Sequence, residues 1–83
     1  MSKLNLEVIS TTGIIFSGEC TQAVVPCVEG EIGFMEGHEI LVALLKEGVI
    51  KVLGDSDKLI KEIDVKGGYV EMKGVNNLVV LTD

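Results

Sequence analysis

Apolar and polar residues alternate along much of this chain. Leu4, Leu6 and Val8 alternate with Asn5 and Glu7, and a second alternating run covers residues 59–65. A two-residue period places successive side chains on opposite faces of a β-strand, so each run predicts a short strand with one wetter face. The predicted strands cover residues 3–9, 14–19, 22–27, 31–34, 40–45, 49–53, 59–65, 69–73 and 78–82.

Composition and turn signals support an all-β fold. Val and Ile together supply 20 of the 83 residues, and β-branched side chains fit a pleated surface better than a helix. Glycine-rich turns, such as Gly54 to Asp57 and Gly67-Gly68, punctuate the runs at the spacing of an antiparallel sandwich or barrel. The apolar segment 39–46 is also compatible with a helix, but its length of about eight residues favours a strand.

The length predicts a single domain that covers residues 1–83. The mean hydropathy of +0.45 is high for so small a chain, whose surface-to-volume ratio requires many polar residues outside. We therefore expect another chain to cover part of an apolar surface. No segment reaches the ~18 consecutive apolar residues of a membrane span, and the first ten residues lack the core of an export signal.

Charge narrows the classes of partner. The chain has 13 acidic residues, seven lysines and no arginine, for a net charge of −6, which disfavours nucleic-acid binding. Six glutamates and no lysine lie between Leu4 and Leu45, and four of these glutamates fall within residues 29–39. This acidic segment is either a solvated loop or a docking surface for a basic partner.

The sequence contains no convincing catalytic or metal-binding motif. Cys20 and Cys27 are seven residues apart, which is not a metal-binding or redox spacing, and His38 would bring the soft ligands to three. No glycine motif for phosphate binding is present, so we predict no cofactor and no metal. A small hydrolase that pairs His38 with a cysteine is the least favoured hypothesis.

Several short motifs, in this order and spacing, resemble the epsilon subunit of the rotary proton-translocating ATP synthase. The resemblance covers essentially the whole chain. The family usually has Gly where Cys27 stands, and prolines where Glu36 and Ile40 stand. It usually continues past the position of Asp83 into a two-helix hairpin, so the resemblance is to its β-sandwich domain alone. The motifs are Phe16-Ser17-Gly18-Glu19, Val25-Pro26, Glu29-Gly30-Glu31-Ile32-Gly33, Gly37-His38, Gly67-Gly68-Tyr69-Val70-Glu71 and Val79-Val80-Leu81-Thr82-Asp83.

This resemblance implies a ten-strand β-sandwich of two antiparallel sheets. It further implies a rotor subunit of the central stalk, without a catalytic site of its own, that links the gamma subunit to the ring of c subunits. The residues matching the c-ring contact are Glu29, Gly30, Glu31 and Ile32, which would face polar loops carrying a basic residue; His38 matches the contact with gamma. The expected location is the cytoplasmic face of the bacterial inner membrane, with membrane association only through the complex.

A different class of function remains open beside the rotor subunit. In this alternative the chain is a small stand-alone β-sandwich module whose acidic loop, Glu29 to Glu39, captures a basic peptide or a metal ion. Such a module would bind its ligand in the absence of gamma and of the c-ring loops.

Overall fold

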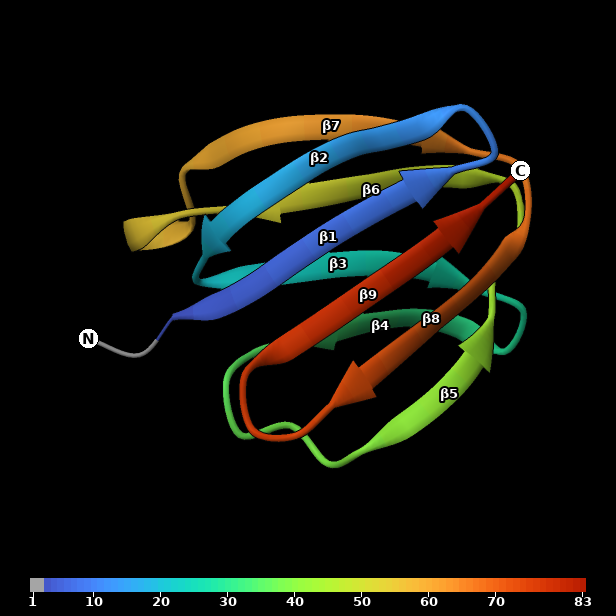
Figure 1. Cartoon of the computed structure of the whole chain (residues 1–83). Helices are drawn as coiled ribbons and strands as arrows, with labels where there is room; N and C mark the ends of the chain where they lie inside the picture. The colour runs from blue at the N-terminus through green and yellow to red at the C-terminus, as the bar shows by residue number, and fades with distance from the viewer. Residues whose placement is uncertain (1–2) are drawn as a thin grey trace.

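Nine β-strands and one 3-10 turn account for most of residues 3–83, the part of the chain that the computed structural model describes (Figure 1). In chain order the elements are β1 (Leu4–Ser10), β2 (Gly13–Cys20), β3 (Gln22–Cys27), β4 (Gly30–Phe34), β5 (Leu41–Leu44), β6 (Gly48–Leu53), η1 (Asp55–Asp57), β7 (Leu59–Val65), β8 (Gly68–Lys73) and β9 (Asn77–Thr82). Within this part of the chain no helix is long and apolar enough to cross a membrane.

The strands form two sheets that pack face to face, as Figure 1 shows. One sheet has the order β2-β1-β9-β8-β5, and the other has the order β4-β3-β6-β7. In β1 the buried side chains are Leu4, Leu6 and Val8, so the predicted alternation does place the apolar positions inside. Phe34 and Met72 fill the core between the sheets. The all-β sandwich is therefore confirmed, as is the strand in segment 39–46.

Two details differ from the expected ten strands in two antiparallel sheets. Over residues 3–83 the structure has nine strands, and an isolated bridge joins Cys27 to Leu45 outside them. In addition, β1 and β9 run parallel, with Leu6 opposite Leu78. A tight turn forces two strands to be antiparallel, but β1 and β9 come from opposite ends of the chain and share no turn.

Backbone hydrogen bonds join the two sheets at one corner. The Val28 N–H donates to the Leu44 carbonyl at 2.9 Å, and the Lys46 N–H donates to the Pro26 carbonyl at 3.1 Å. Together with the bridge between Cys27 and Leu45, these bonds attach the end of β3, in the four-stranded sheet, to the end of β5. The β3–β4 hairpin is thus fixed against the edge of the five-stranded sheet.

Candidate functional site

The β3–β4 hairpin presents two carboxylates at one end of the sandwich. Val28 and Glu29 form its two-residue turn, and β4 begins at Gly30, whose φ of +127° is a value that side chains rarely tolerate. Glu29 and Glu31 are both exposed to solvent. Gly30, with its positive φ, therefore lets the chain turn into β4 at the position between the two acidic residues.

Apolar neighbours hold this hairpin in place. Ile32 lies opposite Val25 in the strand pairing and packs against the core, while Phe34 at the end of β4 is fully buried. The residues assigned to the c-ring contact, Glu29 to Ile32, lie together, with both acids exposed and Ile32 packed against the core. Their contact role stays a prediction.

His38 lies in the segment that follows β4, at the opposite end of that strand from the hairpin turn. Its ring centroid is 4.8 Å from that of Phe34, and its Nδ1 donates a hydrogen bond of 2.9 Å to the Glu39 carbonyl. The Gly37 N–H donates to the Val75 carbonyl at 2.7 Å, which ties this segment to the β8–β9 turn. His38 is half-buried and held in position, although neither of the family's two prolines is present beside it.

The acidic segment is not one continuous surface. Strand β4 divides it, so that Glu29 and Glu31 lie at the hairpin end, whereas Glu36 and Glu39 lie beyond Phe34 at the other end. A single acidic loop from Glu29 to Glu39, which the stand-alone module would need, is therefore not formed as a unit. The hairpin carries its own pair of acids.

Both cysteines belong to the core. Cys20 and Cys27 are buried free thiols, and burial raises the pKa of each above its ordinary value of 9.0. For Cys20 a hydrogen bond from the Gln22 backbone and the charge of Lys3 offset part of this rise in pKa. A nucleophilic cysteine needs a lowered pKa and access to substrate, so this environment does not favour a thiol hydrolase. Among residues 3–83, no three His, Cys, Asp or Glu side chains are grouped to hold a metal.

An apolar band crosses the outer face of the five-stranded sheet. In β1 the residues Leu4, Leu6 and Val8 face the core, so Ile9 faces outward. Strand pairing places outward-facing apolar side chains beside it on all five strands, in the order Ile14, Ile9, Leu81, Tyr69 and Leu44. The sequence predicted a covered apolar surface but not its members, because only the strand register aligns residues so distant in the chain.

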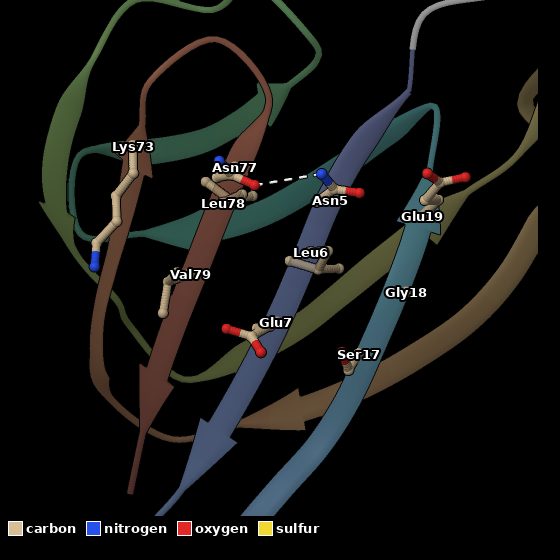
Figure 2. Close-up of a pocket in the computed structure, with 10 residues that line it drawn as sticks. All are labelled: Asn5, Leu6, Glu7, Ser17, Gly18, Glu19, Lys73, Asn77, Leu78 and Val79. Carbon is tan, nitrogen blue, oxygen red and sulfur yellow. Dashed lines mark hydrogen bonds between the residues drawn. The ribbon is translucent and has the colours of Figure 1, made fainter.

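The other end of the same face is polar. A hollow of about 530 Å³ lies there. Figure 2 shows the residues from β8, β9, β1 and β2 that line it. The Asn5 side chain donates a hydrogen bond of 3.3 Å to that of Asn77, and Glu19 and Lys73 lie at the two sides of the hollow (Figure 2). The outer face therefore has a polar end and an apolar end.

Comparison with known proteins gives a family match and a set of relatives. The profile of the family described as "ATP synthase, Delta/Epsilon chain, beta-sandwich domain" matches residues 3–83. The ATP synthase epsilon chain of Leptospira borgpetersenii is 43% identical over 81 residues, which are 98% of this chain and 61% of that protein. The epsilon chain of Campylobacter fetus is 36% identical over 83 residues, which are 100% of this chain and 63% of that protein. The chain thus spans less than two thirds of the length of these relatives.

Solved structures share the fold. A chain of the Euglena gracilis mitochondrial ATP synthase, in an OSCP/F1/c-ring structure, superimposes with a TM-score of 0.88 at 20% identity, over 99% of this chain and 51% of that one. A chain of the Tetrahymena thermophila enzyme, in a central stalk and c-ring structure, gives a TM-score of 0.76 at 12% identity, over 96% of this chain and 63% of that one. At these identities the likeness concerns the sandwich architecture.

Proposed function

The chain belongs to the family of ATP synthase delta/epsilon chain β-sandwich domains, and from that premise we propose that it is a non-catalytic subunit of the central stalk. In this role it links the gamma subunit to the c ring and couples proton flow to ATP synthesis or hydrolysis within the complex. The observation that carries the proposal is the β3–β4 hairpin, which presents Glu29 and Glu31 outward from a rigid end of the sandwich.

The hairpin supplies the contact with the c ring. Its two exposed carboxylates complement a polar loop with a basic residue, and Gly30 and Ile32 set their position. Opposite charges across an interface raise the rate of encounter and fix its register. Because Ile32 and Phe34 anchor β4 in the core, the carboxylates are held in place before the partner arrives.

The gamma subunit covers the outer face of the five-stranded sheet in this proposal. The apolar band of that face accounts for the high mean hydropathy, and an apolar interface core is typical of lasting subunit contacts. His38, next to β5 at the edge of the same sheet, contributes at the margin of this contact. We place the assembled complex on the cytoplasmic face of the bacterial inner membrane, where this subunit meets the membrane only through its partners.

A sandwich suits a part that transmits torque. The two sheets share one core, and hydrogen bonds also join them at the Val28–Leu44 corner, so they resist sliding over one another. Because its strands make contacts between distant parts of the chain, the domain unfolds cooperatively and stays stiff until it unfolds. The subunit then needs no chemistry of its own, only two adhesive surfaces.

Glu31→Lys in the reconstituted complex tests the proposal. The change turns an attraction into a repulsion, and we expect a loss of proton-driven ATP synthesis while ATP hydrolysis by the detached F1 part is retained. Glu62→Lys is the matched control, because Glu62 is also exposed and lies on β7, at the edge of the four-stranded sheet farthest from β4. Unchanged ATP synthesis with Glu31→Lys, at equal occupancy of the subunit, would refute the c-ring contact.

A further inference from the structure

A small pocket lined by several aliphatic residues and by Glu29 lies between the β3–β4 hairpin and the edge strand β5. Its volume is about 260 Å³, and residues from β3, β4, β5 and the hairpin turn line it. Cys27 and Ala43 contribute to its lining from the two strands that the corner hydrogen bonds hold together. Its aliphatic lining residues are Val28, Ile32, Val42 and Leu44.

Part of the wall of this pocket is apolar, exposed and held in place. Val28 is 59% exposed and Val42 is 64% exposed, although both are aliphatic. Val28 cannot swing away from β5 freely, because its N–H is bonded to the Leu44 carbonyl. Because these residues are already held in place, they lose little conformational entropy when a partner binds, which lowers the free-energy cost of binding.

The size and the charge of the pocket identify its occupant. Sites for small molecules usually measure about 300–1,000 Å³, so this one suits a side chain or two of another protein. Glu29 lines the pocket, and Glu31 is exposed on the adjoining strand. The complementary ligand is a protein loop that presents an apolar side chain next to a basic one.

We propose that this pocket, formed by Val28, Ile32, Val42 and Leu44, receives an apolar side chain of the loop whose basic residue meets Glu29 and Glu31. The proposal rests on the proposed function, under which the loop belongs to a c subunit. It extends the contact from the hairpin to β5, two residues of which, Val42 and Leu44, join the interface. The carboxylates then set orientation, and the apolar side chain resists dissociation.

The test measures binding of the full chain, in complex with gamma, to the detergent-solubilised c ring of the same organism. Val28→Thr and Val42→Thr each replace a methyl group by a hydroxyl and keep a β-branched side chain suited to these positions. A hydroxyl buried without a partner is unfavourable, so we expect each variant to bind about tenfold more weakly. Val75→Thr is the matched control, because Val75 is 64% exposed but lies in the β8–β9 turn, away from the pocket.

Support for the pocket requires that both variants lose c-ring affinity, that Val28→Thr still binds gamma as the wild type does, and that Val75→Thr keeps the wild-type c-ring affinity. Affinity for the c ring within twofold of wild type in both variants, with Glu31→Lys still weakened, overturns the pocket and leaves the hairpin contact intact. An unweakened Glu31→Lys variant overturns the proposed function itself. If Val75→Thr loses as much c-ring affinity as the two pocket variants, the pocket is also overturned, because the loss would then not depend on where the substitution lies.

Discussion

Gly68, the first residue of β8, should be among the least replaceable residues of the fold. Its φ of +120° lies in the region that side chains rarely adopt. A Cβ atom at this position would overlap the Leu81 carbonyl oxygen of the neighbouring strand and would come within 2.9 Å of the Thr82 Cα. These are backbone atoms of β9, a strand in the middle of the five-stranded sheet, so they cannot turn aside as a side chain would.

Two costs add up in Gly68→Ala. Keeping the native φ leaves a strained residue, which costs about 1–3 kcal/mol. Relieving the overlap moves the start of β8 away from β9 and weakens bonds between them, such as that from the Asp83 N–H to the Gly67 carbonyl, at about 0.5–1.5 kcal/mol each. We expect a loss of about 2–4 kcal/mol in the free energy of unfolding, and a larger loss for Gly68→Val. A chain of this length has about 4–12 kcal/mol in total.

The adjacent glycine provides the control. At Gly67 a Cβ would meet only a side-chain oxygen of Asp83, at 3.2 Å, and the φ is not positive. Gly67→Ala should therefore change the free energy of unfolding by no more than about 0.5 kcal/mol. Urea unfolding followed by far-UV circular dichroism measures both variants, and equal midpoints for Gly67→Ala and Gly68→Ala would refute the steric argument.

Two further predictions concern the β6–β7 turn and the thiols. Ser56 and Asp57 both have left-handed φ angles, of 59° and 57°, so Asp57→Gly should raise the free energy of unfolding by about 0.5–1 kcal/mol; a lower urea midpoint would contradict this. Since burial raises the pKa of Cys20 and Cys27, unfolded thiols ionise first above pH 9.0, and stability should fall as the pH rises from there. A Cys20→Ala, Cys27→Ala double variant should show a flatter decline in its urea midpoint between pH 8 and 10, and an identical decline would count against the assignment.

The strands were predictable because each one has a single buried face. A two-residue period fixes which side chains point inward, and turn residues mark where each run stops, as in β1 and β7. The pairing of strands was less accessible. Nothing local in Leu6 or Leu78 indicates that β1 and β9 lie side by side in parallel, since that contact joins the two ends of the chain.

The candidate site was predictable as a segment but not as a surface. The charge pattern and the family resemblance marked the segment from Glu29 to Ile32, and in the structure this segment exposes both of its acids. The pocket could not be found in the same way, because it combines that hairpin with Val42 and Leu44, which the sequence presents only as part of an apolar strand. Likewise, β4 separates the acidic residues into two groups, and a count of charges along the sequence does not show where that strand lies.

Leu44 connects the two surfaces that the proposed function requires. It ends the apolar band on the outer face of the five-stranded sheet, where it pairs with Tyr69, and it also lines the pocket beside the hairpin. Its carbonyl accepts the Val28 N–H, so a force on the hairpin passes directly into β5. From β5 the hydrogen-bond ladder continues across β8, β9 and β1, along the line of the band. If the c ring is held at the hairpin and the gamma subunit on the band, the hydrogen bonds between neighbouring strands connect the two contact surfaces. The connection then does not depend on side-chain packing alone.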